Sequence, residues 1–366
     1  MNVQKKMRGQ LRHLGSIGLL SLMVTACGGG GTDPASPPTV GSSDPEYIAV
    51  ATQTASGNAA RIAAATKTAS SNAACGASEL PEGFYWEIGD RNGAKASGTV
   101  KGTDTPTAGQ VIAIASSSKW VYSTYVLQKV PGVRESDVPF LHFTSGWVYP
   151  ALPLSAAAKE AVCGVSETVG ECAADANYVA AADNRFYYSA GHFQHHAASV
   201  MGLGAMHAAE LTSEVTSVLG VADFRYLQTN LAGGVNASAS GYASFLRKML
   251  RGDYAMLKEL GSHKVCASAA CSAGAVLSPA PVNEAWQYSL GHWVEDDPIV
   301  GDGAFSSAGA LGFYPWIDKS KTWYGVVARR AASVNDGQGV KSLRCGRLIR
   351  QAWVTGIPVS STTPTP

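Results

Sequence analysis

The stretch that decides the fold is VIAIASSSKWVYSTYV, residues 111–126. Its first five residues are apolar, which is typical of a buried strand. The pairs at 121–122 and 125–126 lie four residues apart, which is the spacing of one face of a helix. The sequence therefore predicts a strand that runs into a helix, with the serines of 116–118 at the junction.

The regions on either side of this stretch extend the pattern. Large apolar side chains recur at every second position in 84–88, a turn sequence Asp-Arg-Asn-Gly occupies 90–93, and a second extended run covers 94–100. This arrangement predicts a β-hairpin. Apolar side chains at i, i+3, i+4, i+7 and i+8 predict an amphipathic helix over 242–250. Three later segments complete the prediction: strands at 305–317 and 323–327 and a basic helix at 340–354.

The first residues have the layout of an export signal. Four basic residues precede an apolar run at 14–24, and Thr25, Ala26 and Cys27 follow it. The run is shorter than the roughly 20 residues that a transmembrane helix needs. We expect residues 1–26 to be a signal peptide, with Cys27 lipidated as the first residue of the mature chain. Ordinary secretion with Cys27 as a spare thiol is the alternative, and export is expected in both cases.

The rest of the chain is expected to form one domain that a tether joins to the lipid anchor. Gly28, by its resemblance to other lipoproteins, indicates sorting to the outer membrane, facing the periplasm. Without the signal peptide the chain has 24 basic and 27 acidic residues and no basic stripe, so nucleic-acid binding is not expected. Residues 27–45 predict a flexible tether. A helical segment at 46–80 is expected to pack on one domain at 81–358, with a disordered tail at 359–366.

The cysteines fit an oxidising compartment. Setting Cys27 aside leaves an even number, enough for three disulfides. Pairing across the shortest loops gives Cys163–Cys172 and Cys266–Cys271 and leaves Cys75–Cys345. Free buried thiols are a weaker alternative, and a zinc site is weaker still because no paired C-x-x-C spacing occurs.

The junction at 116–119 has the composition of a nucleophile and its base. Ser116 and Lys119 are three residues apart, so on a helix they share one face and Lys119 Nζ can reach Ser116 Oγ. A serine hydroxyl attacks a carbonyl only when a base takes its proton, and a buried lysine can be that base. The spacing is also common by chance, with a solvated capping serine as the alternative.

Four further motifs follow in order: FLHFTSG at 140–146, FYYSAG at 186–191, AGGV at 232–235 and SAG at 307–309. Together with the hairpin and S-x-x-K, this order resembles the penicillin-recognising serine hydrolases, the group of class C β-lactamases, DD-peptidases and carboxylesterases. The resemblance covers nearly the whole domain. It implies an α+β fold, an antiparallel sheet from both chain ends flanked by helices, with a mainly helical insertion from about residue 128 to 283.

The resemblance also implies a role for each matching residue. Ser116 would be the acyl-accepting nucleophile, Lys119 its base, and Tyr188 the group that passes protons to the leaving atom. Backbone N–H groups of Ser116 and Ala310 would form the oxyanion hole. Tyr188 has an alternative role as an aromatic that fills the core. The substrate-binding positions would be Ser307, Ala308, Gly309 and Ala190.

Two of these positions depart from the family pattern. Ala190 stands where the family has asparagine, and Ser307 stands where it has lysine or, in esterases, histidine. Both changes argue against penicillin, so the expected substrate is a carboxylic ester or short amide, with no cofactor. Two alternatives stay open. One is a β-lactamase or DD-peptidase for β-lactams or wall peptides, with Arg329 or Arg330 as a replacement cation, and the other is a non-catalytic envelope lipoprotein.

Two other clusters could hold a metal, but neither has a recognised ligand spacing. The histidines are His192, His195 and His196, for which a polar or packed helix face is expected. The carboxylates are Glu295, Asp296, Asp297 and Asp302, for which a solvated loop is expected. No metal site is therefore predicted.

Overall fold

The structure is a computed structural model that describes residues 45–130, 132–149, 163–271, 275–333 and 337–360. The expected signal peptide, the lipidation site Cys27 and all but the last residue of the tether lie outside these ranges. Two units separate, residues 1–51 and residues 52–366, and everything below concerns the second. Among the helices of the described part, none is long and apolar enough to cross a membrane.

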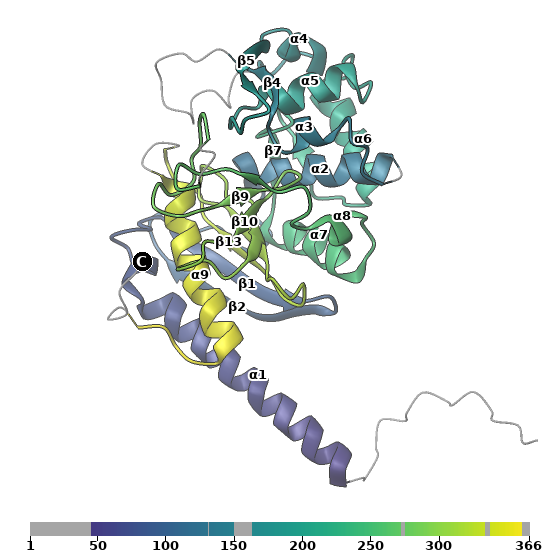
Figure 1. Cartoon of the computed structure of the whole chain (residues 1–366). Helices are drawn as coiled ribbons and strands as arrows, with labels where there is room; N and C mark the ends of the chain where they lie inside the picture. The colour runs from purple at the N-terminus through teal and green to yellow at the C-terminus, as the bar shows by residue number, and fades with distance from the viewer. Residues whose placement is uncertain (1–44, 131, 150–162, 272–274, 334–336, 361–366) are drawn as a thin grey trace, which may run out of the picture. The chain divides into compact units, whose positions relative to one another are not determined.

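An antiparallel sheet of eight strands lies at the centre of this unit (Figure 1). Its strands are ordered β2-β1-β13-β12-β11-β10-β9-β8. Their bounds are β1 (Gly83–Asp90), β2 (Gly93–Lys101), β8 (Val265–Cys266), β9 (Gln287–Tyr288), β10 (Trp293–Glu295), β11 (Ala304–Ser306), β12 (Tyr314–Ile317) and β13 (Tyr324–Ala328). The hairpin β1–β2 pairs with β13 from the opposite end of the chain, which confirms the predicted α+β sheet.

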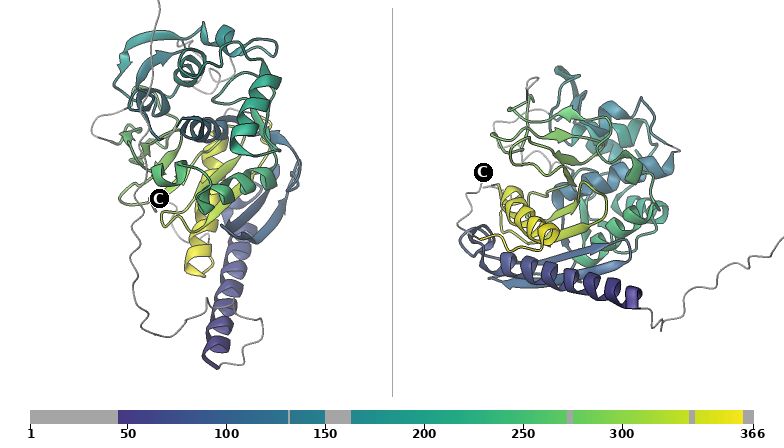
Figure 2. Two further views of the ribbon diagram at one scale, coloured as in Figure 1. Left: turned by 90° about the vertical axis from the view of Figure 1, so that its right-hand side faces the viewer. Right: turned by 60° about the horizontal axis from the view of Figure 1, so that its bottom comes forward.

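Helices cover both faces of the sheet (Figure 2). From α7, Arg247 donates a hydrogen bond to the Tyr324 hydroxyl, whereas Gly346 of α9 lies against Val327. Tyr324 and Val327 are an odd number of positions apart in β13, so they point to opposite faces. The helices are α1 (Pro45–Ser71), α2 (Ser118–Lys129), α3 (Val138–Leu141), α4 (Val169–Ala173), α5 (Gly191–Ser199), α6 (Ala208–Leu219), α7 (Ala239–Arg251), α8 (Met256–Glu259) and α9 (Gln338–Thr355).

Two small sheets complete the unit, and one of them positions the nucleophile. Their strands are β3 (Ile112–Ala113), β6 (Arg225–Tyr226) and β7 (Val235–Ala237) in one, and β4 (Ser145–Val148) and β5 (Asn177–Asp183) in the other. β3 pairs with β7, and Ile114 N–H donates to the Val235 carbonyl at 3.1 Å. The pairing brings the start of residues 111–126 beside the glycine-rich turn at 232–235.

The strand predicted over 305–317 is wrong as a single element. It forms β11 and β12 with a turn between them, in which Gly309 N–H donates to the Phe313 carbonyl and Gly312 N–H to the Gly309 carbonyl. Gly312 has φ +90°, which a side chain would strain. An apolar run gives no sign of this turn, because the turn depends on glycine conformation and not on hydrophobicity.

Three disulfides and the contacts of Val359 near the C-terminus link segments of the unit. The disulfides are Cys75–Cys345, Cys163–Cys172 and Cys266–Cys271, the same pairing that the loop lengths favoured. Val359, placed in the disordered tail by the sequence, is instead buried. Its N–H donates to Thr68 Oγ1 and its carbonyl accepts from Asn72 Nδ2, so α1 holds this residue in place.

Candidate active site

Ser116 lies in a short turn between β3 and α2. Residues 115–117 form one turn of 3-10 helix, and α2 begins at Ser118. Ala115 has φ +45°, an uncommon conformation for a residue with a side chain. Strained residues of this kind often occur at functional sites. The sequence argument placed both Ser116 and Lys119 on one helix, whereas only Lys119 is on it.

The turn brings Lys119 to the serine side chain. Lys119 Nζ donates to Ser116 Oγ at 3.0 Å and to the Ala232 carbonyl at 2.9 Å. Ser116 is 4% exposed and Lys119 is 1% exposed. Burial disfavours the charged form of an amine, and only a neutral amine can accept a hydroxyl proton. The arrangement can therefore serve proton transfer from Ser116 to Lys119.

The turn that carries the Ala232 carbonyl is held by buried amide side chains. Asn230 Oδ1 accepts from Ala232 N–H at 2.9 Å. Gln194 of α5 donates to the Thr229 carbonyl at 2.8 Å and accepts from Leu231 N–H at 3.2 Å. Neither amide was identified from the sequence, since a single buried Gln or Asn has no periodic or motif signal. Both fix the turn that presents a carbonyl to Lys119.

Tyr188 lies in an aromatic cluster beside Lys119. Lys119 Nζ is 4.6 Å from the centroid of the Tyr188 ring, a distance typical of a cation–π contact. Trp293 of β10 stacks on the same ring at 5.4 Å, and Phe143 meets it edge-on at 5.5 Å. The ring fills core and also faces the lysine, and the catalytic role of Tyr188 stays a prediction. Trp293 was missed because β10 is far from the motif in sequence.

The SAG segment packs against the nucleophile turn. Ser307 Oγ donates to the Ser116 carbonyl at 3.1 Å, and Ser117 Oγ donates to the Ser307 carbonyl at 2.6 Å. A side chain at Gly309 would come within 2.2 Å of the Ile114 carbonyl, so the contact requires glycine. The structure thus brings this segment to Ser116, while the oxyanion role of Ala310 stays a prediction.

Neither the altered motif positions nor the two arginines considered as replacements offer a free charge to a substrate. Ala190 is buried at the start of α5, where it supplies only a methyl group. The fully buried Arg329 donates to Glu82 at 3.3 Å and to Gln338 Oε1 at 2.6 Å. Arg330 pairs with Asp104. Both arginines considered as replacement cations are therefore already engaged with other groups.

The histidines of α5 serve packing and hydrogen bonding. His192 is buried between Ser145 Oγ at 2.7 Å and the Tyr187 carbonyl at 2.9 Å, and burial lowers its pKa to about 3. His196 contacts Tyr122 and Asp137. Among the described residues, no group of three or more potential ligands is placed to hold a metal ion.

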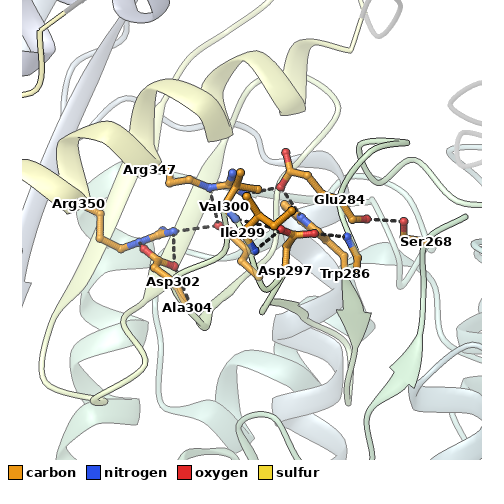
Figure 3. A network of polar contacts seen from close by, with 12 residues as sticks. Ser268, Glu284, Trp286, Asp297, Ile299, Val300, Asp302, Ala304, Arg347 and Arg350 are labelled. Carbon is orange, nitrogen blue, oxygen red and sulfur yellow. Dashed lines mark hydrogen bonds and ion pairs between the residues drawn. The ribbon is translucent and has the colours of Figure 1, made fainter. Parts of the chain in front are cut away.

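The solvated loop expected around the carboxylates is found only in part, because Asp302 is partly exposed whereas Glu295 and Asp297 are buried. Glu295 is 0% exposed and binds Arg347 and Arg350. Figure 3 shows the two arginines beside Glu284 and Asp302, with which they also form ion pairs. Burial alone would raise the pKa of Asp302, but the Arg350 guanidinium holds it below its ordinary value. Backbone N–H groups likewise lower the pKa of Asp297. The arginine partners of Glu295 and Asp302 come from α9, more than forty residues away in sequence, so no local pattern indicates them.

Comparisons with known proteins agree on the fold. No protein-family model and no curated protein matches the sequence. EstCE1, a hydrolase with promiscuous acyltransferase activity, matches with a TM-score of 0.55 and 13% identity over 83% of this chain and 99% of that one. The D-amino acid amidase of Ochrobactrum anthropi matches with a TM-score of 0.54 and 12% identity, over 75% and 94% of the two chains.

A β-lactamase from Mycobacterium bovis matches with a TM-score of 0.51 and 16% identity, over 76% of this chain and 97% of that one. At such identities the likeness concerns the backbone arrangement and not the activity. The chain therefore has the fold of the β-lactamases and penicillin-binding proteins, which the order of its motifs predicted.

Proposed function

We propose that this protein is a serine hydrolase that acts through an acyl-enzyme on a carboxylic ester or short amide. The observation that carries the proposal is the 3.0 Å contact between Lys119 Nζ and Ser116 Oγ in a buried turn. A nucleophile and a base within hydrogen-bond reach are the minimum for covalent acyl transfer. The fold supports the assignment because S-x-x-K stands where a strand meets a helix.

In the proposed reaction, Ser116 Oγ attacks the substrate carbonyl carbon while its proton passes to Lys119 Nζ. The resulting oxyanion accepts hydrogen bonds from the N–H groups of Ser116 and Ala310. The carbonyl then re-forms as the bond to the leaving group breaks, while Tyr188 delivers a proton to that group and regains one from the Lys119 ammonium, which becomes neutral again. Water attacks the acyl ester by the reverse sequence, which releases the acid and restores Ser116.

The altered motifs favour an uncharged acyl group. Ser307 directs its hydroxyl to a backbone carbonyl, and Arg329 and Arg330 are engaged elsewhere. A β-lactam or wall-peptide carboxylate would need a cation as its partner. Two proteins of similar fold are named as a hydrolase with promiscuous acyltransferase activity, EstCE1, and as a D-amino acid amidase. Esters and short amides are therefore the substrate class to test first.

Labelling of the purified protein tests the proposal. A fluorophosphonate should attach to Ser116, as read by peptide mass spectrometry, and a fluorescent penicillin should not. Ser116→Ala and Lys119→Ala should abolish labelling, whereas Ser213→Ala, at an exposed serine of α6, should leave it unchanged. Label from both probes would indicate a penicillin-recognising enzyme. No label from either would favour the non-catalytic binding protein.

We also propose that the enzyme is anchored in the cell envelope through a lipid on Cys27. Export is supported by the basic start, the short apolar run and the even number of remaining cysteines. In a bacterial host, the full chain should fractionate with membranes and Cys27→Ala should fractionate with the soluble envelope proteins. A Cys27→Ala protein that stays with the membranes would refute the anchor.

A further inference from the structure

A cavity of about 750 Å³ lies between α1, α9 and the loops at 299–302 and 318–323. Ser116 and Lys119 are not among its lining residues, so it is separate from the candidate active site. Cavities of this size are typical of sites for small organic ligands. All of its lining residues belong to the unit that begins at residue 52.

Cationic side chains outnumber carboxylates in the lining of the cavity, because Arg61, Lys319, Arg347 and Arg350 face only Asp302 and Asp318. Asp302 pairs with Arg350, whereas Asp318 keeps its charge and accepts from the N–H groups of Thr322 and Trp323. Two lining cations, by contrast, have no ion-pair partner within the described part of the chain. They are Arg61 of α1 and the exposed Lys319. A ligand that enters is therefore met by two uncompensated cations.

Part of the wall is apolar and aromatic, and polar side chains such as Asn72, Ser320 and Gln351 line the rest. Trp323 lies under the Arg61 guanidinium, 5.4 Å from its ring centroid, and Trp353 supports it edge-on at 5.2 Å. Val354 is 49% exposed and Ile299 is 89% exposed, so both can offer apolar surface to a ligand. The cavity thus offers an apolar surface next to the two cations.

The frame of the cavity is held rigidly. Arg350 is fixed by Glu295 and by Asp302, the second of which is seen beside it in Figure 3. The Cys75–Cys345 disulfide ties α9 to the short turn that follows α1. A site that is formed before binding loses less free energy in ordering its residues. The opening is therefore a preformed feature of the fold.

We propose that this cavity binds an amphipathic anion. The carboxylate, sulfonate or phosphate group lies between Arg61 and Lys319, and the apolar body lies against Val354 and Trp323. This inference does not depend on the proposed hydrolase activity, and it defines a second binding site whose lining does not include Ser116 or Lys119.

Calorimetric titration with decanoate tests the proposal on the folded full chain. One equivalent should bind about tenfold more tightly than either 1-decanol, which lacks the charge, or inorganic phosphate, which lacks the apolar body. Equal affinity for decanol would overturn the proposal. Binding to phosphatidylglycerol vesicles without binding of monomeric decanoate would also overturn it, in favour of a membrane contact.

Variants locate the bound decanoate. Arg61→Gln and Lys319→Gln should each weaken binding about fivefold, and Lys101→Gln, which removes an exposed cation outside the cavity, should not. Val354→Trp should block the cavity while the melting temperature stays unchanged, because this side chain is half-exposed. Unchanged decanoate affinity in all three cavity variants would place the ligand elsewhere and refute the site.

Discussion

The protein contains two buried polar regions that are built in different ways. At Ser116, a lysine contacts a hydroxyl, a backbone carbonyl and an aromatic ring, all presented by turns. At Glu295, two arginines of α9 form ion pairs with carboxylates that flank β10. The first region is arranged for proton transfer and the second for holding α9 on the sheet. Stability and chemistry should therefore respond to different substitutions.

The largest effect is expected when the ion-pair network is broken. Arg350→Met leaves Glu295 buried with only one of its two arginine partners, so the free energy of unfolding should fall by about 3–5 kcal/mol. Arg330→Met removes an exposed pair with Asp104 and should cost less than about 1 kcal/mol. Urea unfolding measures both, and fluorophosphonate labelling of Ser116 in the folded fraction should stay unchanged. If both variants lost the same free energy of unfolding, the Glu295 region would not have the special role in stability that is proposed for it.

A second prediction concerns acid. Burial lowers the pKa of His192 to about 3, below the value of about 6.5 in an unfolded chain. Between these values the unfolded state binds more protons, so stability falls as the pH falls. His192 should contribute a loss of about 2 kcal/mol from pH 7 to pH 5. In urea titrations at both pH values, His192→Gln should lack this loss, whereas the exposed His207→Gln should keep it.

If His192→Gln kept the full pH dependence, the residue would not be held neutral. The measurement also bears on the comparison of the two regions, because His192 stacks on Phe143, which meets Tyr188 edge-on. Acid should therefore weaken the packing behind the candidate site, while the carboxylates of the α9 network stay ionised down to a lower pH.

A third prediction concerns Gln194, whose side-chain amide holds the turn that presents the Ala232 carbonyl to Lys119. Gln194→Met removes both contacts to the 229–231 turn, so the rate of fluorophosphonate labelling should fall about tenfold. Gln128 of α2 makes the same two kinds of contact, to the Asp253 carbonyl and from Ala255 N–H, but on the surface. Gln128→Met is therefore the matched control and should label normally. A purely structural Gln194 would lower stability without shifting the pH profile of labelling, which would contradict a positioning role.

Local patterns predicted the elements that depend on local spacing. The hairpin at β1–β2 and the helix α7 follow from residues two and four apart, and both are found. The sequence placed Ser116 next to Lys119 for the same reason. The Arg350 network, Gln194 and Trp293 were missed because each acts on a segment that only the folded chain brings near. The turn inside 305–317 was missed because its glycines act through backbone angles.

The smallest effect is expected from restoring the altered motifs. Ser307→Lys together with Ala190→Asn would return a cation and an amide to the positions where the family has them, beside the Ser116 turn. Because Ala190 is buried and Ser307 packs against Ser116, both new side chains must displace neighbours, so fluorescent-penicillin labelling should rise only a few-fold. Fluorophosphonate labelling in the same samples shows whether the nucleophile survives. A double variant that labels normally with fluorophosphonate and gains nothing with penicillin would mean that recognition of a charged substrate depends on more than these two positions. The nucleophile turn and the recognition segment would then have diverged independently on one fold.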